Sequence, residues 1–493
     1  MTLPIQPAEG ASLFVLGEEG VFFWAPRQEL YVFNTSATFI WCCITEGMLP
    51  ADMTHAYRGA FKVSFDEARA HVAGMLSRWW GLGYIEGAAV PDGVGVSFTT
   101  ILGRLLSNPR LRQQLADAPR ETARRLGVKE LDLDAILSLD VMKLERQVTR
   151  LTMKATSARQ GASVAPDAAL SHLVGHDKTL LEFATEVRGQ SSAPATIERY
   201  YRMLTTTFCL RFSSASQEMC IHPSFAHLAV AGPQRGDTII DILEGDDGHV
   251  IFHDQVPVKH CRHLDQLAPK IKSLFRHIAI NRHEFFLEIH AGVVSNGEKC
   301  VVMPGAPGKG KTTLTAGLSV SGFEYFSDEV ALLDTQSLEV RPFPLGLGIK
   351  RGAVDTVAAL WPDLRSVSAH SREDGQRVRY LSLPSSRIAP PGKSLPVGWL
   401  IFPEYGAGFQ TSLRPITKGE AMRRLMDQCM TLPQLFDEAR VETLVRWMRQ
   451  VECFELRLSS LAQAVQLITR LCLDTNRRGK GATPLRSEAG SSQ

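Results

Sequence analysis

A glycine-rich segment near the middle of the chain has residue types and spacing suited to binding phosphate groups. Gly305, Gly310, Lys311 and Thr312 fit the pattern G-x-x-x-x-G-K-[ST] within "PGAPGKGKTTL". Glycines let such a loop turn tightly, so backbone N–H groups near a helix N-terminus face the anionic oxygens. We expect Lys311 to reach the β- and γ-phosphates of ATP and the Thr312 hydroxyl to ligate Mg²⁺. The expected nucleotide-contacting residues are Gly305, Ala306, Pro307, Gly308, Lys309, Gly310, Lys311, Thr312 and Thr313.

An acidic pair follows this loop. Asp328 and Glu329 come directly after the strand-like stretch "FEYFS", downstream of Lys311. Two carboxylates at the end of a strand could hold Mg²⁺ and accept a proton from an attacking hydroxyl. We assign Asp328 to Mg²⁺ together with Thr312, and either carboxylate could take the proton. His290, at the end of "FFLEIH", has either a structural hydrogen bond or a supporting chemical role.

The segments around these residues alternate between strands and helices. The apolar run "KCVVMPG" predicts a strand before the loop, and "KTTLTAGLSV" predicts a helix after it. Residues 200–288 combine strand-like runs, a turn at Asp246, Asp247 and Gly248, and an amphipathic helix. Residues 13–87 indicate a short strand meander, three helices and a closing strand, which is a small winged-helix-like α+β module.

The length of 493 residues favours several domains. A stretch alternating charges with leucines predicts a helical insert, and an Ala/Ser/Gly-rich stretch after it is typical of a linker. We therefore predict a multidomain α/β protein. Its predicted parts are an N-terminal module (1–96), a helical insert (97–160), a linker (161–198), a P-loop α/β domain (199–475) and a disordered tail (476–493).

The overall composition gives no sign of a polyanionic partner. The chain has 54 Lys and Arg against 52 Asp and Glu, a formal net charge of +2, so neither nucleic acid nor an acidic membrane is expected as a partner. The nine cysteines form no C-x-x-C pair, which indicates a reducing compartment. No signal-peptide pattern is present, and no run approaches the roughly 18 apolar residues of a spanning helix. We expect a cytoplasmic protein.

The three motifs together resemble the HPr kinase/phosphorylase family of bacterial serine kinases, over about residues 290–352. A closer likeness is to HPr-kinase-related proteins encoded beside peptide-modification genes, whose motifs look like "HAGVV", "PGAPGKGKTTL", "SDEVALL" and "PFPLGLGIK". The resemblance implies a C-terminal P-loop domain of the HPr kinase/PEP carboxykinase-like α/β fold. HPr kinases are hexamers, so the resemblance allows a homo-oligomer, although no interface motif is matched.

Carried over by position, the resemblance makes His290 the active-site histidine and Lys311 the phosphate-loop lysine. The proton-accepting aspartate of the family falls at Glu329, a change that lengthens the side chain by one methylene. The metal-binding glutamate of a glycine-rich signature falls at Phe343, so that ligand is expected to be lost. Lys350 resembles the lysine of the related subfamily and would clamp phosphate, although one exposed lysine is equally compatible with a solvated surface.

The N-terminal module resembles the PqqD-like peptide-recognition fold over about residues 13–86, in its order of elements and in "YVFNTSATFIWCCITEG" and "GMLSRWWGLGYIEG". That resemblance implies that a leader peptide adds as a strand to the sheet edge beside the last helix. A winged-helix DNA reader is the alternative, but the last helix offers little basic surface for phosphates.

These expectations combine into an ATP- and Mg²⁺-dependent Ser/Thr peptide kinase whose first module captures a substrate precursor peptide. Tethering would raise the concentration of that peptide at the kinase. Two alternatives stay open: a small-molecule hydroxyl kinase of the same fold, and a nucleotide-gated peptide-binding protein that transfers no phosphate.

Overall fold

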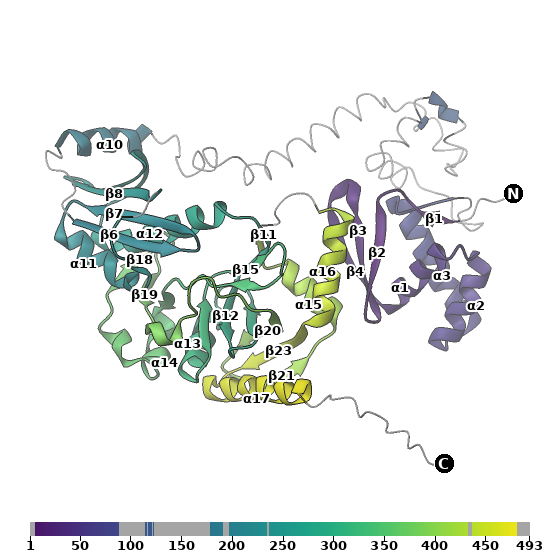
Figure 1. Cartoon of the computed structure of the whole chain (residues 1–493). Coiled ribbons are helices and arrows are strands. Elements are labelled where there is room, and N and C mark those ends of the chain that lie inside the picture. Colours follow the sequence, from purple (N-terminus) through teal and green to yellow (C-terminus); the bar gives the residue numbers. More distant parts are fainter. Residues whose placement is uncertain are drawn as a thin grey trace, which may run out of the picture. The chain divides into compact units, whose positions relative to one another are not determined.

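The computed structural model describes residues 5–87, 114–115, 117–120, 122, 178–190, 197–233, 236–431 and 436–480 (Figure 1). The chain forms two compact units, which are Met1–Val164 with Thr417–Arg423 and Gln434–Gln450, and Ala165–Ile416 with Arg424–Pro433 and Val451–Gln493. The predicted mixed α/β multidomain architecture is confirmed, with a small sheet-and-helix region at the N-terminus and several mixed sheets. Most of the predicted insert, and the tail beyond Lys480, lie outside the described residues.

The first unit begins with a three-stranded antiparallel sheet in the order β2-β3-β4. The Asn34 side chain caps α1 by accepting the Ala37 N–H at 2.9 Å, and Ser64 and Glu67 form a capping box at the start of α3. The elements are β1 (Gln6–Pro7), β2 (Ala11–Leu16), β3 (Glu19–Trp24), β4 (Glu29–Phe33), α1 (Thr35–Thr45), α2 (Pro50–Phe61), α3 (Phe65–Leu82) and β5 (Ile85–Glu86).

A helix from late in the sequence completes this unit. α16 (Glu438–Gln450) packs on β2, where the Ser12 hydroxyl donates to Glu438 Oε1 at 2.8 Å. The Arg449 guanidinium also donates to the Val15 carbonyl. The unit is therefore discontinuous in sequence, which differs from the predicted boundaries because α16 falls within 199–475.

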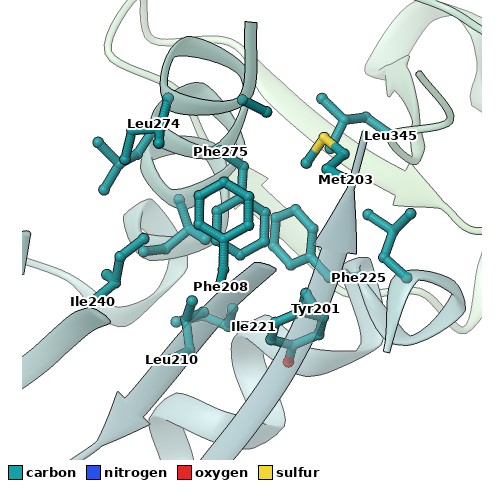
Figure 2. Packing of buried hydrophobic residues seen from close by; sticks show 14 of the residues in the cluster. Tyr201, Met203, Phe208, Leu210, Ile221, Phe225, Ile240, Leu274, Phe275 and Leu345 are labelled. Atoms are coloured by element: carbon teal, nitrogen blue, oxygen red, sulfur yellow. The ribbon is translucent and has the colours of Figure 1, made fainter. Parts of the chain in front are cut away.

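The second unit opens with a five-stranded sheet in the order β10-β9-β8-β7-β6. On β9, Ile251 packs with α12, whereas Val250 and Phe252 pack with α10, so the two helices cover opposite faces. Phe208 and Phe275 stack at 4.2 Å in the core on the α12 side (Figure 2). The elements are α10 (Lys178–Gln190), β6 (Ile197–Met203), β7 (Thr206–Phe212), α11 (Ala215–Ile221), β8 (Thr238–Gly245), β9 (Gly248–His253), β10 (Val256–Cys261) and α12 (Leu267–Asn281).

Helix α10 lies inside the predicted linker 161–198, so that segment is not entirely a linker. Leu180, Ala184 and Val187 recur at helical spacing and are buried against the sheet. The Ala/Ser-rich composition around the helix obscured this short apolar stripe.

A six-stranded sheet in the order β14-β12-β13-β20-β23-β21 carries the glycine-rich loop. β13, β20 and β23 are parallel, and α13 and α17 pack together on the sheet. Gly292 on β12 lets α13 approach closely, because an added Cβ would lie 2.4 Å from Thr315 Oγ1. The strands are β12 (Ala291–Ser295), β13 (Cys300–Pro304), β14 (Glu324–Ser327), β20 (Val397–Tyr405), β21 (Ser412–Pro415) and β23 (Glu452–Leu458), and the helices are α13 (Lys311–Val320) and α17 (Leu461–Lys480).

Two smaller sheets flank it, in the orders β16-β15-β11-β22 and β17-β19-β18. Their strands are β11 (Phe285–Ile289), β15 (Ala331–Asp334), β16 (Val340–Arg341), β17 (Leu347–Lys350), β18 (Ala369–Ser371), β19 (Arg377–Leu381) and β22 (Cys429–Thr431), with helix α14 (Val354–Ala358) nearby in the chain. Helix α15 (Lys418–Met426) begins in the first unit, which includes Thr417–Arg423. Across the described part of the chain, no helix has both the length and the apolar character needed to cross a bilayer.

Candidate active site

The glycine-rich segment forms a loop between β13 and α13, as its sequence predicts. Gly308 and Gly310 have φ angles of +87° and +93°, a left-handed conformation that disfavours residues with a Cβ. Gly310 caps α13, so the helix begins at Lys311. The loop therefore places backbone N–H groups at a helix N-terminus, which is the arrangement that binds phosphate.

The Lys311 side chain folds back onto this loop. Its ammonium donates to the carbonyl of Gly305 and to that of Ala306, the latter at 3.2 Å. Burial lowers the pKa of Lys311 to about 8, and Asp328 opposes the shift while nearby Lys350 adds to it. A phosphate group in the loop would offer the ammonium a stronger, charged acceptor in place of these carbonyls.

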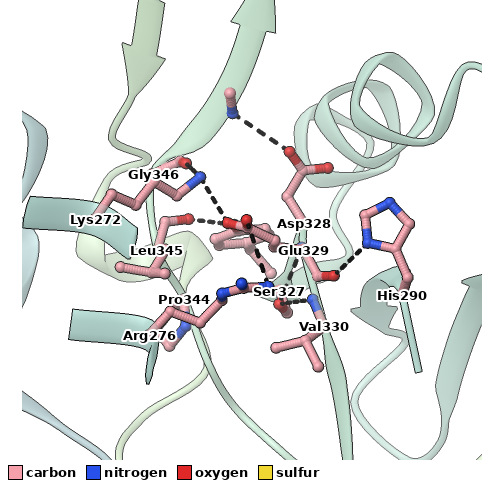
Figure 3. A network of polar contacts seen from close by, with 12 residues as sticks. Lys272, Arg276, His290, Ser327, Asp328, Glu329, Val330, Pro344, Leu345 and Gly346 are labelled. Atoms are coloured by element: carbon pink, nitrogen blue, oxygen red, sulfur yellow. Dashed lines mark hydrogen bonds and ion pairs between the residues drawn. The ribbon is translucent and has the colours of Figure 1, made fainter. Parts of the chain in front are cut away.

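Asp328 directly follows β14 and lies beside the loop helix (Figure 3). Its Oδ2 accepts the Gly348 N–H at 3.3 Å, and its buried Oδ1 has no hydrogen-bond partner among the described residues. Burial raises the pKa of Asp328 to about 7, against the lowering effects of Lys272 and the Thr312 hydroxyl. Thr312 and Asp328 thus present the oxygen ligands that Mg²⁺ prefers, and a metal ion would give the unpartnered Oδ1 a partner.

Glu329 has a different environment from its neighbour. Its Oε2 lies 3.0 Å from the Lys272 ammonium and its Oε1 lies 4.0 Å from the Arg276 guanidinium, both on α12. Burial alone would raise the pKa of Glu329, but these two cations hold it down to about 2. The Ser327 hydroxyl accepts the Glu329 and Val330 N–H groups at 3.3 and 3.2 Å and so fixes the turn after β14.

His290 connects the acidic pair to the phosphate loop. Its Nδ1 lies 3.1 Å from the Glu329 carbonyl oxygen (Figure 3). A carbonyl can only accept, so Nδ1 carries the proton and Nε2 keeps its lone pair. The main chain contributes as well, because the Gly305 N–H donates to the His290 carbonyl at 3.4 Å. Burial and the Lys311 cation lower the pKa of His290, which favours the neutral ring.

Three further positions that the sequence or the resemblance singled out, Lys350, Phe343 and Lys309, differ in their surroundings. Lys350 ends β17 close enough to Lys311 to affect its pKa, and its ammonium makes no hydrogen bond or ion pair among the described residues. Phe343 is fully buried in the core beside Leu345, so its position offers no metal ligand. Lys309 forms an ion pair with Glu404 at 3.0 Å.

Three side chains at this site were not predicted from the sequence, which are Lys272, Arg276 and Tyr405. Tyr405 ends β20 and is 55% exposed, and a Cβ added to Gly310 would lie 3.5 Å from its Cβ. An exposed aromatic ring next to a phosphate loop offers a face on which a nucleobase could stack. The only sequence signal for it was an aromatic residue at the end of a predicted strand.

Comparisons with known proteins assign no family to this chain. No protein-family model matches the chain. A search of curated proteins also gives no match. The structure nevertheless brings His290, the phosphate loop, Asp328, Glu329 and Lys350 together in the second unit.

Proposed function

We propose that this protein is an ATP-dependent kinase that phosphorylates a Ser or Thr hydroxyl of a peptide captured by its N-terminal module. The observation that carries the proposal is the buried Asp328 carboxylate, whose Oδ1 has no hydrogen-bond partner among the described residues, beside a glycine-rich loop that ends in Lys311. The Thr312 hydroxyl is close enough to this carboxylate to lower its pKa. This arrangement combines a phosphate cradle, a metal-compatible pair of oxygens and an adjacent second carboxylate. The resemblance of these motifs to HPr kinases supports the same assignment.

Each side chain has a task in such a transfer. Thr312 and Asp328 would hold Mg²⁺, which would neutralise part of the negative charge on the phosphates. Lys311 would exchange its loop carbonyls for phosphate oxygens, and Lys350 would add a second cation. One of the two carboxylates, Asp328 or Glu329, would accept the proton of the attacking hydroxyl, and His290 would hold the Glu329 backbone in place.

The acceptor hydroxyl would form its new bond to the γ-phosphorus as the bond to the leaving ADP oxygen breaks. The hydroxyl proton passes to the accepting carboxylate and then to solvent. No oxidant or reductant is needed, and the products are the phosphate ester, ADP and a proton.

The N-terminal module would supply the peptide. Outer strand β4 is paired only with β3 in the described residues, and its Phe33 stacks on Trp79 of α3 at 5.2 Å. One sheet edge therefore runs beside the last helix, as a PqqD-like module requires for strand addition. The other outer strand, β2, is covered by α16.

A coupled assay of ADP formation tests this function. Wild-type protein should form ADP with Mg²⁺·ATP only when an acceptor peptide is present, and Lys311→Ala should abolish the signal. Lys299→Ala is the matched control, because this exposed lysine precedes β13, whereas the loop follows that strand. ADP formation that no peptide stimulates would favour a small-molecule kinase, and no ADP formation despite ATP binding would favour a nucleotide-gated binder.

A further inference from the structure

A basic pocket opens on the Glu329 side of the site. It has a volume of about 560 Å³ and is lined by six cations, which are Lys259, Arg262, Lys270, Lys272, Arg276 and Arg372. Only three carboxylates line it, so positive charges exceed negative ones by three. Its position next to Glu329 places it where an acceptor would approach.

Carboxylates that line the pocket form ion pairs with four of its six cations, so two cations have no such partner. Lys272 and Arg276 share Glu329, Lys270 lies 2.6 Å from Glu373, and Arg372 pairs with an aspartate at 3.5 Å.

The side chains of Lys259 and Arg262 make no ion pair or hydrogen bond among the described residues, although the backbone of Lys259 pairs with β9. They come from β10 and the residue just after it, whereas Lys272 and Arg276 come from α12. Arg372 follows β18. A solvated helix face would explain cations on one element, but not cations converging on one cavity from three elements.

This convergence has an electrostatic consequence. Cations around a concave site attract anions and repel cations, and they select between ligands of opposite charge. A neutral acceptor would gain nothing from Lys259 and Arg262, whereas a carboxylate could pair with both, and an arginine can hold it with two hydrogen bonds.

We propose that this pocket binds acidic side chains of the acceptor peptide, so that the hydroxyl phosphorylated next to Glu329 is flanked by Asp or Glu. The inference rests on the proposed kinase function, and it narrows the substrate class to acidic peptide segments.

Binding of short acceptor peptides to the full chain tests the proposal. Two fluorescent peptides lack any leader segment and carry one serine, flanked by glutamates in one and by glutamines in the other. We expect wild-type protein to prefer the glutamate peptide by about tenfold at low salt, and the preference to shrink as salt is added. Lys259→Glu and Arg262→Glu should remove it, whereas Arg365→Glu, a reversal at a 66% exposed side chain outside the pocket, should preserve it.

Unchanged affinity for Mg²⁺·ATP in each variant shows that it is folded. Equal affinity of wild-type protein for the two peptides, or a preference that survives both pocket reversals, would overturn the proposal. Because binding needs no phosphoryl transfer, the two ideas fail separately. A glutamate preference without phosphorylation keeps the pocket and counts against the kinase, whereas equal binding with phosphorylation of both peptides keeps the kinase and removes the pocket.

Discussion

Glu329 Oε2 lies 3.0 Å from Lys272 Nζ, so the second residue of the acidic pair is held by a cation from α12. Asp328, its neighbour in the chain, instead accepts the Gly348 N–H, and the nearby Thr312 hydroxyl only partly offsets the effect of burial on its pKa. Two adjacent carboxylates therefore have opposite electrostatic environments, one favouring the charged form and one disfavouring it. This difference separates a metal-compatible carboxylate from one that lines the basic pocket.

Removing the cation should destabilise the second unit. Lys272→Met leaves Glu329 with only the more distant Arg276, and we expect a loss of about 1–3 kcal/mol, below the value for fully buried pairs because solvent reaches Glu329. The double variant Lys272→Met/Glu329→Gln should recover part of that loss. Urea unfolding of the wild type, the two single variants and the double variant measures the coupling free energy between the two side chains. Strictly additive losses of unfolding free energy would contradict the ion pair.

The two carboxylates should also respond differently to pH in metal-free protein. The folded-state pKa of Asp328, about 7, lies above its unfolded value, so the folded state holds a proton that the unfolded state has released. Stability should therefore fall as pH rises from 5 to 8, and Asp328→Asn should relieve the cost, by about 4 kcal/mol at pH 8.

Glu329→Gln is the matched comparison. The folded-state pKa of Glu329, about 2, lies below its unfolded value, so its contribution is complete above pH 5 and is lost only as pH falls toward 2. Its effect should be constant from pH 5 to 8. The unfolding transition of the second unit is identified as the one that Mg²⁺·ADP shifts. Urea titrations then follow this transition in metal-free protein for both variants. Parallel dependence of unfolding free energy on pH in the two variants would refute the assigned environments.

Tyr405 should contribute to nucleotide affinity through its ring. Tyr405→Ala should weaken ATP binding about fivefold to tenfold, because a stacking contact with the base is lost, while leaving inorganic tripolyphosphate binding unchanged. Tyr405→Phe keeps the ring and should bind like wild type. Calorimetric titration of both ligands separates base from phosphate contacts, and equal weakening for both ligands would indicate a disturbed loop instead.

The exposed ring on β4 should matter for peptide capture. Tyr31 is 40% exposed on this outer strand and lies within 6.4 Å of Phe22, centroid to centroid. Tyr31→Ala should weaken binding of a leader peptide about fivefold. Leu49→Ala removes a 55% exposed side chain at the start of α2 and should have no effect. Anisotropy titrations measure both, and equal affinities would argue against capture at this edge.

Deleting the N-terminal module is a poorer test than these substitutions. α16 packs on β2, and the Gly419 N–H donates to Glu19 Oε2 at 2.9 Å. A deletion of residues 1–96 would leave α16 without that cover, so a loss of activity could reflect misfolding alone.

The parts of the site that sequence predicted are those that local rules determine. An apolar strand, a loop whose glycines adopt left-handed angles, and a helix starting at Lys311 follow from neighbouring residues alone. Lys272 and Arg276 could not be predicted in the same way. Their spacing of four on an amphipathic helix also suits a solvated face, and only the packing of α12 brings them to Glu329.

The discontinuity of the first unit could not be predicted from the sequence either, because it depends on a contact between distant segments. The pattern of α16 predicts an amphipathic helix but does not identify its partner, which is β2 at the other end of the chain. Long-range pairing is a property of tertiary packing, and a single sequence carries little record of it.

Phosphoryl transfer is the central claim, and the intact mass of the peptide product tests it most directly. Precursor peptides encoded next to this gene would be incubated with Mg²⁺·ATP and either wild-type protein or Lys311→Ala. The account predicts a peptide heavier by one phosphate with the wild type alone, on a Ser or Thr that fragmentation identifies. Nucleotide bound or hydrolysed with every peptide unmodified would contradict it.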